Sequence, residues 1–336
     1  MKLKLIACFT AAIVVAACLS AAASAQTNGY RVSDPVSYKN LSIFLIHGKD
    51  ESKKGNILTL QEAMDQKLFV VYETSDVNEL EVENLSKEFD VFIQSGDIVK
   101  GGKQDRVLAV SIIIPARSGR VSIRAFCVES GRWTKRGNED TSKFNSSNDR
   151  IVTKELKLAA NSARSQQEVW DKVSDAQSRL SKNVGEAVNS DQSASSLQLS
   201  LENREVAASV DAYIKQLGRA ADGSSDVIGY AFSINGKINS ADIYVSNTLF
   251  KKVWMKMLKA AATEAVAESR GVRLAEPVKA DAVGQFLDDA EKASSKEESV
   301  GSGAKLITKE DNDNIMFEAR DVKSKAIIHR SYVKKP

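Results

Sequence analysis

Charged and polar residues gather around two turns in the N-terminal third of this sequence. The first turn, residues 100–106, reads Lys-Gly-Gly-Lys-Gln-Asp-Arg, and the second, residues 129–133, reads Glu-Ser-Gly-Arg-Trp. Arginine forms paired hydrogen bonds with phosphates and carboxylates, glycine lets backbone N–H groups approach a ligand closely, and tryptophan offers a stacking face. The set therefore predicts a site for an anionic ligand. Its candidate ligand-binding residues are Lys100, Gly101, Gly102, Lys103, Gln104, Arg106, Glu129, Arg132 and Trp133.

The strands expected around these turns would bring them together. Residues 91–99, 107–115 and 121–129 are rich in β-branched side chains, and turn residues separate them. This pattern predicts an antiparallel meander of three strands. The third strand of such a meander ends at the edge where the first turn lies, so we expect residues 100–106 beside residues 129–133. The alternative is that these charges are solvated or simply tie strand ends together.

Familiar motifs for phosphate, metal and acyl chemistry are incomplete here. Gly96 to Lys103 resembles a phosphate-binding loop, but its spacing is one residue too long and Gln104 stands where Ser or Thr is required. The acidic turn that begins at Asp311 lacks the later ligand positions of a calcium loop. The histidines and cysteines form no close ligand pairs, so no zinc site is expected, although a carboxylate-bound cation stays open. The Gly-x-Ser-x-Gly elbow of many hydrolases is absent.

The first 25 residues have the pattern of a secretory signal. Two lysines precede an apolar run over residues 5–19, and Ala23-Ser24-Ala25 supplies the small residues that a signal peptidase accepts. We therefore expect a signal peptide over residues 1–25 and an exported protein, periplasmic or extracellular. The alternative is a lipoprotein anchored through Cys18, because Val15-Ala16-Ala17-Cys18 resembles a lipobox. No later segment is long and apolar enough to predict a transmembrane helix.

Charge and cysteine content narrow the classes of function. Two of the 47 basic residues lie in the signal, so the remaining chain has nearly as many acidic residues, 44, as basic ones. This balance argues against a nucleic-acid binder with a bulk basic surface. Cleavage after Ala25 would leave Cys127 as the single thiol, which excludes an intramolecular disulfide. We expect Cys127 to be a small core residue.

The patterning predicts an α+β fold, with an N-terminal linker over residues 26–39 and a single domain over residues 40–333. Short strands dominate the N-terminal third, and apolar residues at helical spacing predict one long amphipathic helix over 151–182. Further amphipathic helices, packed on a sheet, are expected after the caps Asn203 and Ser246 and over residues 281–293. Asn235-Gly236 predicts a type I′ hairpin, residues 189–200 and 294–303 read as polar loops, and residues 304–332 predict a C-terminal β-meander.

Several strings of this sequence resemble one family. They are Gly96 to Leu108, Ile112 to Pro115, Cys127 to Trp133, residues 234–237 with 241–242, and Phe250 to Leu258. Together they are similar to the ARG and rhodanese-phosphatase-superfamily-associated protein domain over roughly residues 40–330. The resemblance implies an association with ADP-ribosylglycohydrolases and rhodanese-phosphatases, and so nucleotide or ADP-ribose chemistry, but no particular activity. The export signal departs from a cytosolic setting for such chemistry.

Three hypotheses about function follow. The first is a binding or accessory module that holds an anionic small molecule or a partner segment at the edge formed by residues 100–106 and 129–133. The second is a hydrolase of phosphoester or glycosidic substrates with Asp97 or Glu129 as general base beside Lys103, for which a nucleophile–base pair is missing. The third is a structural or interaction protein that uses the helix over 151–182. Neither a cofactor nor an oligomeric state is indicated.

The two N-terminal processing routes make different mature chains. Mass spectrometry of the protein purified from its native compartment is expected to find Gln26 as the first residue, because the Ala-x-Ala pattern ends a signal of ordinary length. A lipidated Cys18 at the N-terminus would contradict cleavage after Ala25.

Overall fold

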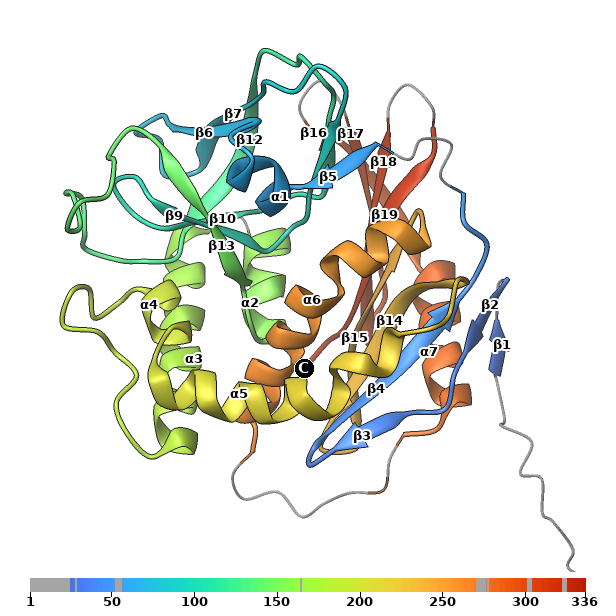
Figure 1. Cartoon of the computed structure of the whole chain (residues 1–336). Coiled ribbons are helices and arrows are strands. Elements are labelled where there is room, and N and C mark those ends of the chain that lie inside the picture. The colour runs from blue at the N-terminus through green and yellow to red at the C-terminus, as the bar shows by residue number, and fades with distance from the viewer. Residues whose placement is uncertain are drawn as a thin grey trace, which may run out of the picture.

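A computed structural model describes residues 25–27, 29–51, 56–163, 165–269, 276, 278–300, 304–321 and 325–336. The fold is α+β, as expected, and Figure 1 shows a large sheet, two smaller sheets, and helices packed between and behind them. The helices are α1 (Leu60–Asp65), α2 (Lys154–Leu158), the π-turn η1 (Ala159–Ala163), α3 (Gln166–Val184), α4 (Leu197–Leu201), α5 (Arg204–Leu217), the 3-10 turn η2 (Gly218–Ala221), α6 (Asn247–Ala267) and α7 (Ala280–Lys292). The strands are β1 (Ala25–Thr27), β2 (Tyr30–Val32), β3 (Val36–Tyr38), β4 (Leu41–His47), β5 (Ile57–Thr59), β6 (Phe69–Glu73), β7 (Glu79–Asn84), β8 (Asp90–Ile93), β9 (Asp97–Gly101), β10 (Arg106–Leu108), β11 (Ile112–Ile114), β12 (Arg120–Cys127), β13 (Phe144–Arg150), β14 (Val227–Ile234), β15 (Lys237–Tyr244), β16 (Ser294–Val300), β17 (Ala304–Glu310), β18 (Asn314–Asp321) and β19 (Ile327–Lys334).

The large sheet has ten antiparallel strands in the order β1-β2-β4-β14-β15-β19-β18-β17-β16, with β3 also paired to β4. Every residue of β4 is buried because both faces of the sheet are covered. Phe44 and Ile46 pack with residues of α7 on one face. Ile43 and Leu45 belong to the core on the opposite face, which α6 covers. Two-sided burial explains why this strand is a continuous apolar run rather than an alternating one.

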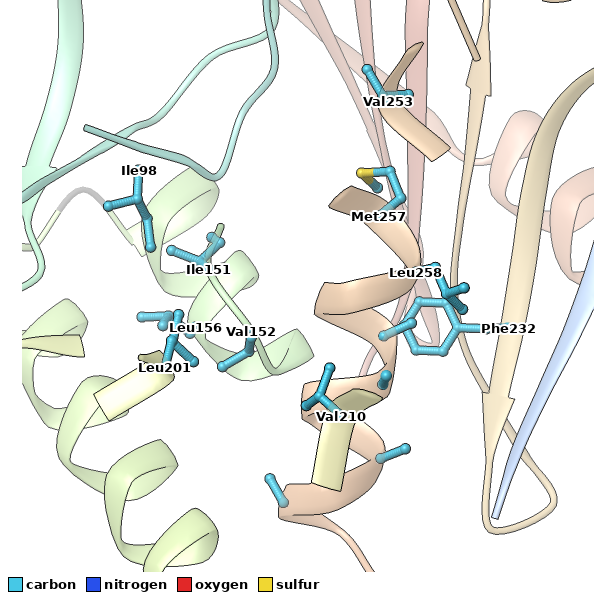
Figure 2. Packing of buried hydrophobic residues seen from close by; sticks show 14 of the residues in the cluster. Ile98, Ile151, Val152, Leu156, Leu201, Val210, Phe232, Val253, Met257 and Leu258 are labelled. Carbon is cyan, nitrogen blue, oxygen red and sulfur yellow. The ribbon is translucent and has the colours of Figure 1, made fainter. Parts of the chain in front are cut away.

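Helix α6 lies at the centre of the main core. Ser246 caps it by accepting a hydrogen bond from the backbone N–H of Leu249, as its sequence predicts. Figure 2 shows Leu258 of α6 against Phe232 of β14, while Ile98 and Ile151 belong to the same cluster on the side of the smaller sheets. The helix is therefore the element against which the large sheet and the N-terminal third both pack.

In the C-terminal half, local turn and cap residues correctly predict several elements. Asn235 and Gly236 have φ angles of 54° and 73°, as a type I′ hairpin between β14 and β15 requires. Asn203 caps α5, and β17, β18 and β19 form the expected meander. Residues 294–300, predicted as part of a loop, instead form β16, which pairs with β17 along its whole length. The pairing partner, and not the polar sequence of this segment, makes it a strand.

The N-terminal third differs from a simple meander. The sequence predicts one continuous strand over residues 91–99 and another over residues 107–115, and both predictions are wrong. The first segment forms β8 and β9, and the second forms β10 and β11. Strands β9, β10 and β12 belong to a six-stranded sheet, whereas β8 and β11 form a three-stranded sheet with β5. Gly96, with a φ of 93°, makes the first break, and its N–H donates to the carbonyl of Leu108 at 2.8 Å. Each broken strand thus covers two sides of one apolar core.

The helix predicted over 151–182 is also interrupted. Helix α2 and the π-turn η1 come first, and Ser165 then caps α3. The apolar side chains of α3, including Val169, Val173 and Leu180, are buried in the main core. That apolar face is thus occupied within the chain. The 189–200 segment, predicted as a loop, contains the first residues of the short helix α4.

The N-terminal predictions fall partly within the described chain. Strands β2 and β3, which pair with β4, lie in the segment 26–39 that was expected to be a linker. The signal predicted over residues 1–25 lies, apart from Ala25, outside the described residues. Among the described helices, none is long and apolar enough to cross a membrane.

Gly229 in β14 allows the close approach of β15. A Cβ atom at this position would lie 2.4 Å from the carbonyl oxygen of Asp242 and 3.0 Å from the Cα of Ile243, which are backbone atoms that cannot move independently. We expect Gly229→Ala to lower the free energy of unfolding by about 3 kcal/mol, the scale of overpacking a core. Urea unfolding followed by circular dichroism measures this change.

Gly218 provides the matched control. It has helical dihedral angles after α5, and an added Cβ would meet Met255 at an ordinary 3.6 Å. Gly218→Ala is expected to change the free energy of unfolding by about 0.5 kcal/mol or less. Equal stability of the two variants would contradict the backbone clash.

Candidate functional site

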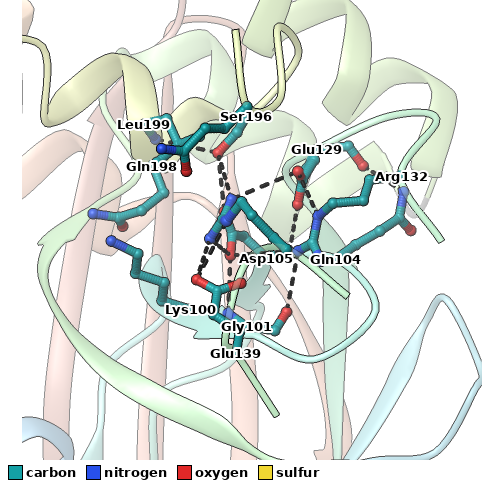
Figure 3. Close-up of polar contacts among 12 residues, drawn as sticks. Lys100, Gly101, Gln104, Asp105, Glu129, Arg132, Glu139, Ser196, Gln198 and Leu199 are labelled. Carbon is teal, nitrogen blue, oxygen red and sulfur yellow. Dashed lines mark hydrogen bonds and ion pairs between the residues drawn. The ribbon is translucent and has the colours of Figure 1, made fainter. Parts of the chain in front are cut away.

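The two turns singled out by the sequence lie side by side. The side-chain Nε2 of Gln104 donates to the backbone carbonyl of Glu129 at 2.7 Å, and the backbone N–H of Asp105 donates to the Glu129 carboxylate at 3.0 Å. Figure 3 shows these contacts together with the residues around them. The predicted juxtaposition of residues 100–106 and 129–133 is therefore confirmed.

Asp105 is the centre of this cluster, although it was not among the candidate residues. Its side chain is fully buried, and Arg136 donates to both carboxylate oxygens at 2.9 Å. The backbone N–H of Gly101 and the hydroxyl of Ser196 also donate to it, each at 2.9 Å. Burial, opposed by Arg136 and reinforced by the charge of Glu129, raises the pKa of the Asp105 carboxyl above its ordinary value.

Glu129 is the second buried carboxylate of the cluster. Burial alone would raise the pKa of its carboxyl, but the hydrogen bond from Arg132 at 2.7 Å and further donors bring the pKa below its ordinary value. Arg132 also donates to the backbone carbonyls of Gly101 and Gly102, at 3.3 Å each, and of Thr134 at 2.8 Å. The guanidinium of Arg132 thus clips the first turn to the second.

The remaining candidate residues divide by exposure. Arg106 is buried on the far side of its strand, where it pairs with Glu73 at 3.1 Å and donates to the carbonyl of Val77. Lys100 pairs with Glu202 at 2.6 Å. The ammonium of Lys103 lies 5.3 Å from the ring centre of Trp133, whose side chain is 44% exposed. Lys103 and Trp133 are thus the candidates that present a surface to solvent together.

The glycines of the first turn have defined tasks. Gly102 has a φ of 56°, and a Cβ there would lie 2.4 Å from the ring of Phe144. The N–H of Gly101 is already used by Asp105, and the N–H of Gly102 donates to the carbonyl of Asp140 at 3.1 Å. Both glycines have positive φ angles, and Gly102 also makes room for the Phe144 ring, which is a different use from the ligand cradle that the sequence suggested.

The two carboxylates considered as general bases are both engaged. Asp97 pairs with Lys256 at 3.0 Å and accepts the backbone N–H of Gln94. Glu129 is held by Arg132 and by the backbone of Asp105. Cys127 is a buried free thiol, as expected, and burial raises its pKa to about 11. Among the described residues, no group of three or more metal-ligating side chains is found.

A hollow of about 730 Å³ lies directly outside the charge cluster. Two loops form it, the loop that follows Glu129 and the turn that precedes α4. The charged residues that line it are the cations Arg132, Lys135 and Arg136, while the carboxylates of Asp105 and Glu129 lie behind them, fully buried. The other lining residues are Ser130, Gly131, Thr134, Gly137, Gln192, Ser193, Ala194 and Ser195.

Sequence reasoning missed two parts of this arrangement. Arg136 follows the second turn by three residues, so a wider window around Trp133 would have included it. The turn at residues 192–195 comes about 60 residues later, and the 192–195 sequence is an ordinary polar loop. It reaches the site because the N–H of Ser130 donates to the Ser195 hydroxyl at 3.1 Å and Ser196 binds Asp105. Only the tertiary structure joins these segments.

Arg136 is expected to be the most important cation for stability. Arg136→Ala would leave the buried carboxylate of Asp105 without its main partner, and removing one member of a buried pair costs about 3–5 kcal/mol of unfolding free energy. Lys100→Ala breaks the partly exposed pair with Glu202 and is expected to cost about 1 kcal/mol or less. Urea denaturation of both variants measures the difference, and a similar loss in each would be inconsistent with a structural role for the Arg136–Asp105 pair.

Comparison with protein families gives one match. Residues 29–333 match the model of the ARG and Rhodanese-Phosphatase-superfamily-associated Protein domain. The match includes both loops of the hollow and all elements from β2 to β18. Comparison with curated proteins and with solved structures found no match.

Proposed function

Since the chain belongs to the family of ARG and rhodanese-phosphatase-superfamily-associated protein domains, we propose that it is a binding module for an anionic small molecule. The ligand lies in the hollow between residues 130–137 and 192–195. The observation that carries this proposal is the polarity of the lining: its charged side chains are cations, and the carboxylates that pair with two of them, Asp105, Glu129 and Glu139, are not among the lining residues. The family name supplies no activity, so the argument rests on this geometry.

The size of the hollow favours binding of a whole small molecule. Its volume of about 730 Å³ falls within the range of ligand pockets in proteins. Ser130, Ser193 and Ser195 line the hollow. The Ser195 hydroxyl is bonded to the backbone of Ser130 and the Ser193 hydroxyl to the Glu129 carboxylate, so of the three it is the Ser130 hydroxyl that can meet a ligand oxygen. A hydroxyl beside cations suits a ligand that carries phosphate or carboxylate together with sugar-like hydroxyls.

The cations differ in what they can offer to this ligand. The guanidinium groups of Arg132 and Arg136 already donate to the carboxylates of Glu129, Asp105 and Glu139, which balance their charge. Lys135 is exposed at the rim and lies between two loop residues that line the hollow. Lys135 is therefore the cation that can move to meet a ligand, and Trp133, two residues earlier, offers a stacking surface nearby.

The predicted export signal indicates the compartment in which this module would bind its ligand. We propose that residues 1–25 direct the chain out of the cytoplasm, and that binding takes place in the periplasm or outside the cell. An ADP-ribose-like ligand, which the name of the family suggests, would then be captured there rather than in contact with cytosolic NAD metabolism.

Titration of the purified chain with inorganic pyrophosphate and with ADP-ribose tests the proposal. Isothermal titration calorimetry is expected to detect binding that weakens as salt is raised, because exposed charges are screened. Lys135→Ala should weaken binding about fivefold, equivalent to one exposed ion pair near 1 kcal/mol, and Lys135→Glu should weaken it further.

Lys172 on α3 is the matched control, since its partly exposed ammonium pairs with Asp175 and it is not among the residues that line the hollow. Lys172→Ala should bind both probes as the unmodified chain does. Binding that is indifferent to both changes at Lys135, or no heat with either probe at millimolar concentration, would overturn the proposal.

A further inference from the structure

A second pocket, of about 330 Å³, lies at one end of the large sheet. It is formed by the turn between β1 and β2, the loop that follows β4, the start of β14, the end of β15 and the start of β19. The lining residues on which the argument rests are Tyr30, Lys49, Glu51, Ile228, Ile243 and Ile327. The pocket shares no lining residue with the hollow at 130–137 and 192–195, so it is independent of the binding function proposed above. Its volume is that of a site for a small ligand.

The inner wall of this pocket is apolar. Ile228 and Ile243 belong to the apolar cluster that packs with α7, and the Tyr30 ring packs against the same cluster. Ile327 adds a half-buried side chain from β19. The loop after β4 lies close to this wall, since a Cβ at Gly48 would lie 2.6 Å from Cδ1 of Ile228. The apolar part of a ligand would therefore meet a wall that is already formed.

Two side chains of opposite charge, Lys49 and Glu51, line the pocket from the loop that follows β4. Both are exposed, and within the part of the chain that the structure describes neither side chain makes a hydrogen bond or an ion pair. They differ in this from the arginines of the hollow, whose charges are balanced by protein carboxylates. Two such groups beside one apolar wall are complementary to a ligand that carries both charges.

Hydrogen bonds fix the loop that presents these two charges. The backbone N–H of Glu51 donates to the carbonyl of Val245 at 3.0 Å. Between the two charged residues, the carboxylate of Asp50 accepts the backbone N–H of Asn247, the first residue of α6, at 3.2 Å. Asp50 is thus directed to α6, whereas the residues on either side of it line the pocket. An anchored backbone lowers the entropy that is lost when a ligand binds.

Tyr30 adds a hydroxyl to the same pocket. Its oxygen accepts a hydrogen bond from Nη1 of Arg330 at 2.5 Å, and its own hydrogen is left for another acceptor because a guanidinium cannot accept. Arg330 is itself held by the carboxylate of Glu318 at 2.6 Å, so it orients the phenol. Burial, opposed by the charge of Arg330, raises the pKa of the Tyr30 hydroxyl above its ordinary value, so the hydroxyl remains a donor at neutral pH.

We propose that this pocket binds a free α-amino acid with an aliphatic side chain, such as leucine. Lys49 and the Tyr30 hydroxyl bind the carboxylate of the ligand, and Glu51 binds its ammonium group. The aliphatic side chain lies against the three isoleucines named above. Lys49 and Glu51 are two positions apart on one loop, so both long side chains can reach the adjacent charged groups of an α-amino acid. An aliphatic acid or amine would leave one charge of the loop without a counterpart in the ligand.

Isothermal titration calorimetry of the purified chain with L-leucine tests the proposal. We expect saturable binding of one leucine per chain at millimolar concentration or below. Isocaproate, which lacks the ammonium group, and isopentylamine, which lacks the carboxylate, should each bind about fivefold more weakly than leucine, the effect of losing one exposed ion pair.

Two variants assign the charges to the two ends of the ligand. Glu51→Gln should weaken leucine binding about fivefold and leave isocaproate binding unchanged, because isocaproate has no ammonium group to lose. Lys49→Met should weaken the binding of both leucine and isocaproate and leave isopentylamine binding unchanged. Both side chains are exposed, so the variants are expected to fold as the unmodified chain does, and circular dichroism checks this.

Asp50→Asn provides the matched control, since it removes a charge from the same loop at a side chain that is directed to α6. This variant, and Lys135→Ala in the hollow, should bind leucine as the unmodified chain does. The absence of heat with leucine at millimolar concentration would overturn the proposal. Leucine binding that is unchanged in both Lys49→Met and Glu51→Gln, or equal affinity for leucine and its two analogues, would overturn it as well.

Discussion

A carboxylate removed from water must be surrounded by donors, and the N-terminal third of this protein is arranged around one such group. Asp105 is fully buried, and moving an unpaired ion of its size into a protein interior costs several kcal/mol. Its four donors are the backbone N–H of Gly101, two guanidinium nitrogens of Arg136 and the hydroxyl of Ser196, which come from three separate segments of the chain. The shape of the hollow outside these loops therefore depends on satisfying one buried charge.

Asp242 imposes the same requirement on the large sheet. It is buried in β15, and its partner His329 is supplied by the neighbouring strand β19, where Asp242 lies opposite Ser331 in register. The network extends through Ser111 to the smaller sheets, so it also fixes how the N-terminal third sits on the large sheet. The two polar centres differ in the volume that they border. The hollow beside the Asp105 cluster has the size of a ligand, whereas the cavity beside Asp242 has room for about one water molecule.

The interrupted strands connect these two centres. Had residues 91–99 and 107–115 been continuous, the side chains of Ser95 and Ser111 would have lain within one regular sheet. The breaks instead put β8 and β11 in a separate sheet and leave both serines on irregular backbone, where Ser111 contacts His329 of β19 and both serines line a cavity with Asp242 of β15. β-Branched composition signals extended backbone but carries no information about which sheet each half joins. That choice follows from the need to enclose an apolar core on two sides.

The sequence by itself determined the elements whose signals are local: the caps of α5 and α6, the Asn235-Gly236 hairpin, the α+β class, and the meeting of the two charged turns. The caps and the hairpin follow from dihedral preferences and hydrogen bonds between residues a few positions apart. The meeting of the two turns follows from the antiparallel order of the strands that carry them. Only the tertiary structure decided that Arg106 turns inward to Glu73, that Arg136 and residues 192–196 complete the charge cluster, and that Ser111 meets His329. Those contacts join residues that are far apart in the chain, and their free energy arises only when packing excludes water from both partners.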